Sequence, residues 1–105
     1  PYPLLEVLLR FVSYPNVYVK VSGVGSRSSE PYPHRDTLPM IRRVYDAFGP
    51  ERLMWGTDFP HVFRPGATGY VECLDLIRKH VDFFTDHDLE WILCKTIQKV
   101  WQFDE

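Results

Sequence analysis

Cysteine, excess basic charge and long apolar runs are all scarce in this sequence, and each shortage excludes a class of protein. The 105 residues hold 2 cysteines, Cys73 and Cys94, which form neither a CxxC metal motif nor a disulfide framework. With 12 Lys and Arg against 14 Asp and Glu, the net charge is −2, so the basic surface of a nucleic-acid-binding protein is missing. No apolar run approaches the roughly 20 residues that span a bilayer. We expect a cytoplasmic protein that binds neither nucleic acid nor membrane.

Helical and strand patterns alternate along the first half of the chain. Leucines and valines at three-and-four spacing predict a helix within 1–12, and β-branched residues predict a strand over 17–22. A long Gly- and Pro-containing loop over 25–36 is expected next, of a kind that usually has a functional reason. A short apolar run predicts a second strand over 53–58.

Helix start and stop signals complete the pattern. Asp36 or Thr37 is expected to cap a helix that ends at Gly49. Apolar spacing predicts another helix around 73–81, and the capping-box pattern at Thr85 opens a last one. Strand, helix and strand in this order predict one right-handed parallel βαβ unit, and hence an α/β fold.

Two strands cannot enclose a core. A (β/α)8 barrel takes eight strands and about 250 residues. Because the sequence starts within a helical pattern, we expect it to be the C-terminal part of such a barrel, with the last two βα units and a terminal helix.

Asp58 is the leading candidate for chemistry because it ends the second predicted strand. Catalytic side chains of barrel enzymes lie at the carboxyl ends of the strands. Strand alternation places Asp58 on the same face as Gly56, which we expect to leave room beside the carboxylate. This carboxylate could accept a proton from water or bind a divalent cation. The structural alternative is a turn or capping aspartate ahead of Phe59 and Pro60.

The decapeptide RLMWGTDFPH at 52–61 resembles the closing-strand motif of the amidohydrolase-related family, which comprises metal-dependent TIM-barrel hydrolases and decarboxylases. PNVYVKVSG at 15–23 is similar to that family's seventh strand and FGPERL at 48–53 to the lead-in to its eighth. WILCKTIQKVW at 91–101 resembles its terminal helix. The resemblance covers nearly the whole chain, so 1–105 is expected to be a partial amidohydrolase-related domain with barrel strands 7 and 8.

The resemblance implies a metal-dependent hydrolase in which water attacks a lactone or amide carbonyl. Asp58 would then be both the catalytic residue and a metal ligand, and His61 would contact the small-molecule substrate. The cofactor that the resemblance implies is a divalent metal, zinc, bound in the complete domain by histidine ligands that this chain lacks. A self-contained zinc site from Asp58, His61 and His34 is the alternative.

Three further residues are candidates for substrate binding at the rim. Arg27 and Arg64 follow the two strands and could each hold a carboxylate by paired hydrogen bonds. Ser22 lies near the rim on the inward face. The alternatives are solvated loop arginines and a structural hydroxyl. His34 is expected to be an exposed loop residue.

Two other functions stay open. A decarboxylase of the same superfamily would keep the same aspartate. A non-catalytic truncated chain is the other, since exposed strand edges invite association with a chain that carries the missing strands, or with a second copy. We expect the isolated chain to be inactive.

Overall fold

The computed structural model describes residues 4–63 and 65–101 and contains a two-stranded parallel sheet in that part of the chain. Strands β1 (Val19–Ser22) and β2 (Leu53–Gly56) pair in register, with Val19 opposite Leu53 and Ser22 opposite Gly56. Helix α3 (Leu38–Phe48) connects them. The predicted parallel βαβ unit is confirmed, although both strands are shorter than expected and β2 ends two residues before Asp58.

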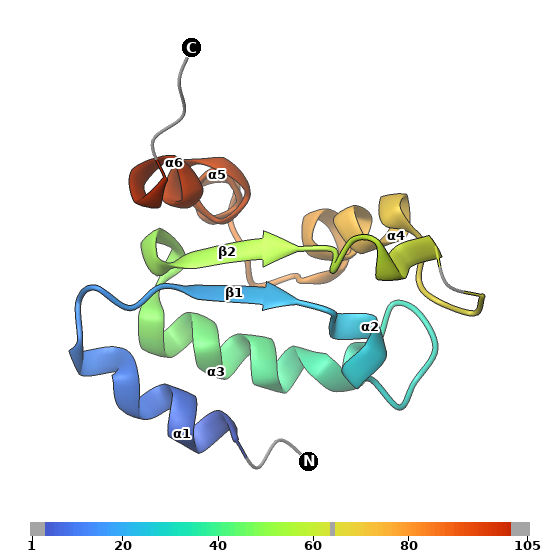
Figure 1. Cartoon of the computed structure of the whole chain (residues 1–105), viewed down its shortest axis with the longest axis horizontal. Coiled ribbons are helices and arrows are strands. Elements are labelled where there is room, and N and C mark those ends of the chain that lie inside the picture. Colours follow the sequence, from blue (N-terminus) through green and yellow to red (C-terminus); the bar gives the residue numbers. More distant parts are fainter. Residues whose placement is uncertain (1–3, 64, 102–105) are drawn as a thin grey trace.

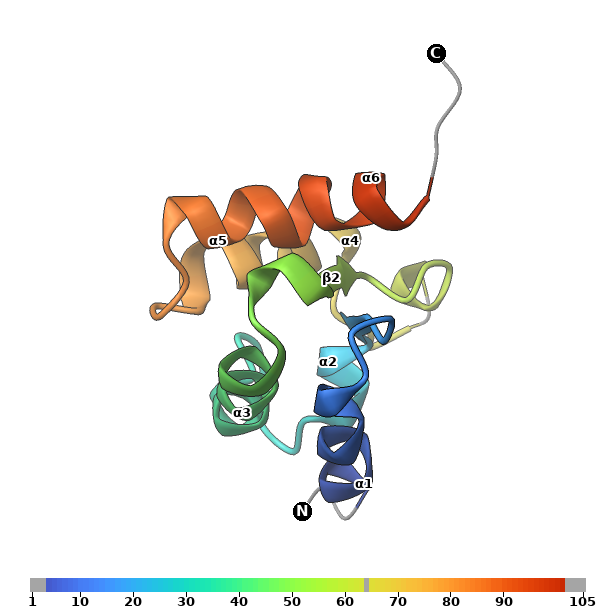
Figure 2. The ribbon, with the colours of Figure 1, turned by 90° about the vertical axis from the view of Figure 1, so that its left-hand side faces the viewer.

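Helices lie both below and above the strand pair in Figure 1, and Figure 2 shows the same arrangement from the side. Helix α3 lies below the strands in Figure 1, with α1 beside it, and the last helical segments pack across β2, end-on in Figure 1 and lengthwise in Figure 2. Helix α1 (Leu5–Leu9) continues into a 3-10 turn (Arg10–Ser13), and the short helix α2 (Val24–Arg27) follows β1. Helix α4 (Tyr70–Asp75) continues into a π-helical turn (Leu76–His80). Helix α5 (Asp86–Glu90) continues through a π-helical turn (Trp91–Lys95) into α6 (Thr96–Val100). No helix in the described part of the chain is both long and apolar enough to cross a membrane.

The core lies between the sheet and these helices. Val19 and Val21 of β1 are buried, whereas Lys20 between them is exposed, as the alternation in the sequence predicts. The buried apolar residues that pack with this face come from α3, β2, the end of α4 and the last helix: Ile41, Val44, Phe48, Leu53, Leu76, Ile77 and Ile92. The opposite face of the sheet therefore has no helical cover within 4–63 and 65–101.

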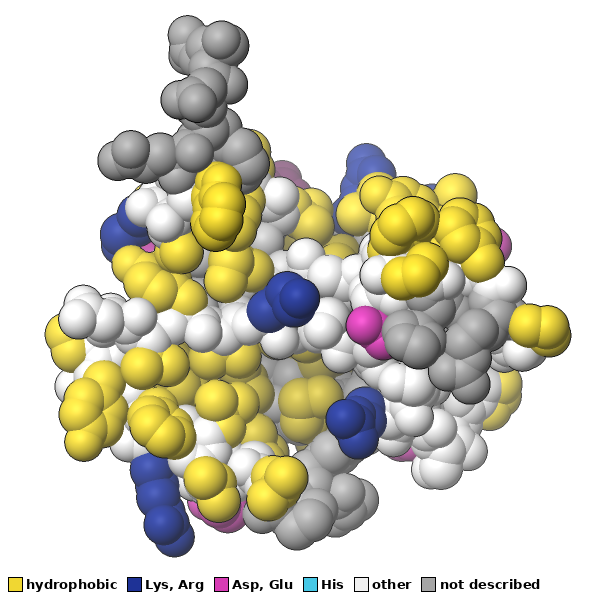
Figure 3. Space-filling view, viewed as in Figure 1, with side chains coloured by type: hydrophobic (Ala, Val, Ile, Leu, Met, Phe, Trp, Pro, Cys, Tyr) yellow, Lys and Arg dark blue, Asp and Glu magenta, His cyan; other side chains and the backbone are white. Residues whose placement is uncertain are grey.

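Apolar side chains are numerous on the face that Figure 3 turns to the viewer, particularly over α1 and the turn that follows it. The large exposed apolar residues of this segment are Leu4, Val7, Phe11, Val12 and Tyr14. Leu4 is 77% exposed and Tyr14 is 60% exposed. Such a contiguous apolar surface is typical of an interface rather than of a solvated face.

The two predicted helix caps differ in outcome. Thr85 and Asp88 form the capping box, since the Asp88 amide donates to Thr85 Oγ1 at 3.1 Å and the Thr85 amide donates to the Asp88 carboxylate at 2.9 Å. The expected side-chain cap of α3 was wrong. Thr37 Oγ1 instead donates to the His34 carbonyl at 2.7 Å, and the Asp36 carboxylate accepts from the Ser29 amide at 2.8 Å.

Arg52 joins the start of β2 to the end of the first helical segment. Its guanidinium donates to three main-chain carbonyls, from Nε to Val17 at 2.9 Å, from Nη1 to Val12 at 2.9 Å and from Nη2 to Tyr14 at 2.7 Å. It also lies 4.7 Å from the ring centroid of Phe48. One side chain thus connects the end of the first helical segment, at Val12 and Tyr14, with Val17, which leads into β1.

Candidate active site

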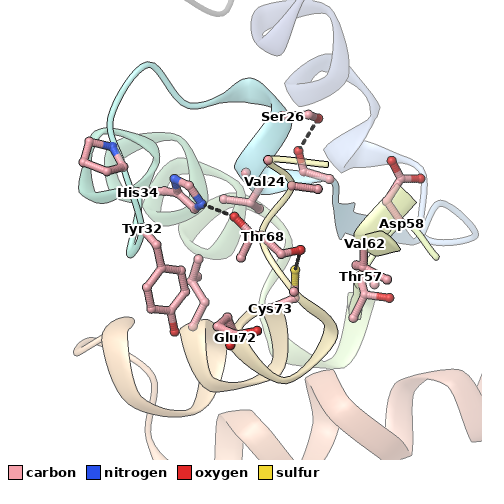
Figure 4. A pocket seen from close by; sticks show the side chains of 18 of the residues that line it. Val24, Ser26, Tyr32, His34, Thr57, Asp58, Val62, Thr68, Glu72 and Cys73 are labelled. Carbon is pink, nitrogen blue, oxygen red and sulfur yellow. Dashed lines mark hydrogen bonds between the residues drawn. The ribbon is translucent and has the colours of Figure 1, made fainter. Parts of the chain in front are cut away.

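A cavity of about 990 Å³ lies between the segment after β1 and the segment after β2 (Figure 4). Both segments leave the carboxyl ends of neighbouring parallel strands, which is where open α/β sheets bind ligands. The lining residues that carry polar or reactive side chains are Ser26, Glu30, Tyr32, His34, Thr57, Asp58, Thr68, Glu72 and Cys73. The cavity therefore gathers polar side chains at the strand ends within a lining that is otherwise largely apolar.

Asp58 lines this cavity and has an exposed side chain. Its φ of 63° lies in the left-handed region, which aspartate tolerates better than most residues. The carboxylate lies against the end of β1, because a Cβ atom built on Gly23 would be 3.4 Å from Asp58 Oδ2. Gly23 has a φ of +63°, so this position suits glycine by its backbone conformation.

Side chains of β1, and not Asp58, occupy the space beside Gly56. A Cβ atom on Gly56 would be 3.1 Å from Ser22 Cβ and 3.4 Å from Lys20 Cδ. The expected role of Gly56 beside the carboxylate was therefore wrong. The reason is that Asp58 lies outside β2 in a left-handed conformation, so strand alternation does not fix its direction.

The other predicted site residues are not gathered around Asp58 in the described part of the chain. Arg27 ends α2 with an exposed side chain, and Ser22 ends β1; neither belongs to the cavity lining. His61 begins a 3-10 turn (His61–Phe63), but its side chain lies outside what the structure describes, as does the whole of Arg64. The substrate-binding roles of all four residues stay predictions.

His34 is buried, which the sequence did not predict. Only 6% of its surface is exposed, and both ring nitrogens make hydrogen bonds. Nδ1 lies 2.8 Å from the Glu30 carbonyl, and Nε2 lies 2.7 Å from Thr68 Oγ1 (Figure 4). The expectation of an exposed loop histidine was wrong because its main partner, Thr68, is 34 positions away in the chain.

Acidic groups lie near the part of the cavity formed by Tyr32 and Cys73. Burial raises the pKa of the Tyr32 hydroxyl, and the negative charges of Asp75 and Glu72 raise it further. Burial also raises the pKa of the Cys73 thiol, with a smaller contribution from Glu72. Both groups therefore stay protonated near neutral pH, so Tyr32 can donate a hydrogen bond to a ligand.

A complete metal site does not form from the residues that the structure describes. Within them, no group of three or more His, Cys, Asp and Glu side chains could hold a metal ion. A zinc site takes three or four such ligands, and Asp58 supplies one oxygen donor. A site formed by Asp58 with His34 is not supported either, because both His34 nitrogens already have partners.

The family is shown by a match to a family model described as amidohydrolase, which extends over residues 2–103. The chain belongs to this amidohydrolase family. It is 36% identical over 59 residues to D-galactarolactone isomerase of Agrobacterium fabrum, a match that covers 56% of this chain and 20% of that protein. It is 43% identical over 51 residues to L-fucono-1,5-lactonase of Burkholderia ambifaria, which covers 46% of this chain and 17% of the relative.

The fold of this amidohydrolase chain is also that of a solved relative. A crystal structure of an amidohydrolase from Burkholderia multivorans with bound zinc matches it with a TM-score of 0.80 at 23% sequence identity. The match covers 95% of this chain and 37% of that structure. The chain thus spans about a fifth of the length of the curated relatives that it matches, and somewhat over a third of the solved one.

Proposed function

We propose that this chain contributes Asp58 to the hydrolysis of a lactone-type carbonyl in an amidohydrolase domain. In that domain β1 and β2 would be strands 7 and 8 of a (β/α)8 barrel, and residues 1–105 would form its last part. The observation that carries the proposal is the placement of Asp58. It follows a parallel strand, lines the cavity and has a left-handed backbone conformation that is uncommon outside glycine.

The chemistry requires little of this chain beyond a positioned carboxylate. Asp58 would accept a proton from a water molecule as the water oxygen forms a bond to the carbonyl carbon. When the bond from that carbon to the ring oxygen breaks, the same proton would pass to the leaving oxygen. The product is the open-chain hydroxy acid. The described residues contain no group of three or more side chains that could hold a metal ion, so Asp58 would supply one oxygen ligand at most to a site completed by other residues.

Residues at the strand ends and in the segments that follow them would hold the substrate. His61 and Arg64 belong to the same segment after β2, and Arg27 and Ser22 belong to the end of β1 and to α2. A positive arginine would orient the carboxylate of an acidic lactone by two parallel hydrogen bonds. Tyr32, protonated near neutral pH, would add a donor on the far side of the cavity.

The exposed surfaces favour a partner polypeptide. Parallel sheets are normally covered on both faces, whereas here one face presents Lys20 and each strand has one edge without a neighbour in the described residues. We propose that a polypeptide with the remaining strands covers this face, or that a second copy of the chain does. The isolated chain would then lack hydrolase activity, and measurable lactone turnover by the purified 105-residue protein would contradict this.

The function is tested by a chimera in which this sequence replaces the matching segment of the Burkholderia ambifaria lactonase. The folded chimera should hydrolyse a sugar lactone, and Asp58→Asn should lower kcat by about 100-fold or more, the usual contribution of a general base. Asp82→Asn is the matched control, since Asp82 is exposed and outside the cavity lining. Equal rates in the two variants would refute the role of Asp58.

A lactone isomerase is the second candidate, because one of the relatives is named as one. The product distinguishes the two reactions. Hydrolysis releases an open-chain acid and so lowers the pH of a weakly buffered solution. Isomerisation gives another lactone of equal mass without releasing acid. A decarboxylase would release carbon dioxide, which neither of the other reactions does.

A further inference from the structure

The segment that follows β2 contacts the region of the short helix α2 at two separate points. Near its start, the Asp58 carboxylate lies beside Gly23. Near its end, Thr68 lies beside Gly25, where an added Cβ atom would be 2.9 Å from Thr68 Oγ1 and 3.1 Å from His34 Nε2. The residue between the two glycines, Val24, is buried in the core and so holds the contact surface in place.

The hydrogen bonds of His34 fix which nitrogen carries the proton. A main-chain carbonyl can only accept, so Nδ1 must donate to Glu30. In the neutral ring, Nε2 is then the acceptor, and the Thr68 hydroxyl donates to it. His34 has a left-handed φ of 58°, and its ring meets the Tyr32 ring edge to face with the centroids 5.7 Å apart. The backbone conformation, the hydrogen bond at Nδ1 and the contact with the Tyr32 ring thus fix the position of the His34 ring.

We infer that His34 is a positioning residue for Asp58. By accepting the Thr68 hydroxyl, it holds the far end of the 57–69 segment on Gly25, while β2 holds the near end. With the near end held by β2 and the far end held beside Gly25, the Asp58 carboxylate is kept beside Gly23, where it lines the cavity. The inference rests on the proposed function only in taking this cavity as the active site.

The unmodified chain gives the first test, which needs no turnover and so is independent of the proposed hydrolase activity. Nitrogen-15 NMR of the neutral histidine rings should show a protonated Nδ1 and an unprotonated Nε2 for His34. The opposite tautomer would overturn the inference, because a protonated Nε2 could not accept the Thr68 hydroxyl.

Two substitutions at Thr68 then separate positioning from general stability. Thr68→Val keeps the shape but removes the hydroxyl, and it should shift or broaden the backbone amide signals of Asp58 and Gly23. Thr68→Ser keeps the hydroxyl and should leave both signals near their original positions. Thr85→Ala, which removes a helix cap at a residue outside the cavity lining, is the control for a destabilised chain and should not move them.

A second variant acts from the histidine side. His34→Asn tolerates the left-handed conformation and keeps a donor near the Nδ1 position, but it cannot reach Thr68. It should reproduce the Asp58 and Gly23 shifts of Thr68→Val, and the double variant should add nothing further. Unchanged Asp58 and Gly23 signals in Thr68→Val would overturn the inference. Loss of folding in both single variants would overturn it too, since the bond would then support the whole fold rather than this segment.

Discussion

Replacing the partly buried Arg52 by lysine should destabilise the chain far more than a conservative change of one charged residue normally does. Arginine presents five N–H donors in a planar fork, and here three of them reach three different carbonyls, those of Val12, Tyr14 and Val17. Lysine keeps the charge but is a point donor at the end of a flexible stem. We expect it to reach one of these carbonyls and to leave two without their partner.

The magnitude follows from the number of bonds lost. A partly exposed hydrogen bond contributes about 1 kcal/mol net, so Arg52→Lys should lower the free energy of unfolding by about 2 kcal/mol. Arg52→Met also loses the third bond, about 1 kcal/mol, and the contact with the Phe48 ring, about 0.5–1 kcal/mol, for a total of about 3.5–4 kcal/mol. Urea unfolding followed by circular dichroism measures both, and a loss of about 2 kcal/mol moves the midpoint by about 1 M or more.

Arg42→Lys is the matched control. Arg42 forms an exposed ion pair with Asp46 one helical turn away, at 3.1 Å, and such pairs contribute about 0.3–0.5 kcal/mol. Its replacement should therefore change the midpoint little. If Arg52→Lys costs no more than Arg42→Lys, the three carbonyls are equally well solvated by water, and the reasoning about Arg52 fails.

Three further outcomes are expected. Thr85→Ala should lower the free energy of unfolding by about 1 kcal/mol because it removes the cap of α5; a loss below about 0.3 kcal/mol would contradict the observed capping box. Burial opposes ionisation of Asp88, yet hydrogen bonds from Thr85 and Tyr45 outweigh it and lower the pKa of Asp88. The ionised form therefore stabilises the fold above the unfolded pKa of about 3.9. This stability is lost as the pH falls through the lower pKa of the folded state. Unfolding measured from pH 7 to pH 3 should thus show a smaller acid-side loss in Asp88→Asn than in the unmodified chain, whereas equal slopes would exclude Asp88 as a source. Cys94 is exposed, whereas burial raises the pKa of Cys73, so a thiol reagent at pH 8 should label Cys94 first; the reverse order in mass spectrometry would be inconsistent with this structure.

Local signals in the sequence predicted local structure well. The capping box at Thr85 and the stop at Gly49 involve residues within one helical turn, so the residue types nearly determine the geometry. The parallel pair also follows from the sequence, because a helix between two short apolar runs brings the strands side by side. The position of Asp58 shortly after a strand follows for a similar reason, since it is a property of the chain order.

Contacts between segments that are distant in the chain could not be predicted from the sequence. Asp36 and Thr37 have the right chemistry for helix caps, but Ser28, Ser29 and the His34 carbonyl compete for their side chains. Nothing near His34 in the sequence indicates Thr68. The left-handed conformation of Asp58 likewise depends on the packing of its segment against Gly23, so the direction of its carboxylate could not be predicted from alternation.

The partners of Arg52 have a consequence for how this family can vary. All three of its acceptors are main-chain oxygens, which every amino acid possesses, so substitutions at 12, 14 and 17 leave the contact intact. The exposed positions 12 and 14 can thus change while the arginine stays, whereas Val17 also packs against the core. No pair of columns in an alignment would change together, and a method that infers contacts from correlated substitutions would miss this link between the residue before β2 and the first helical segment.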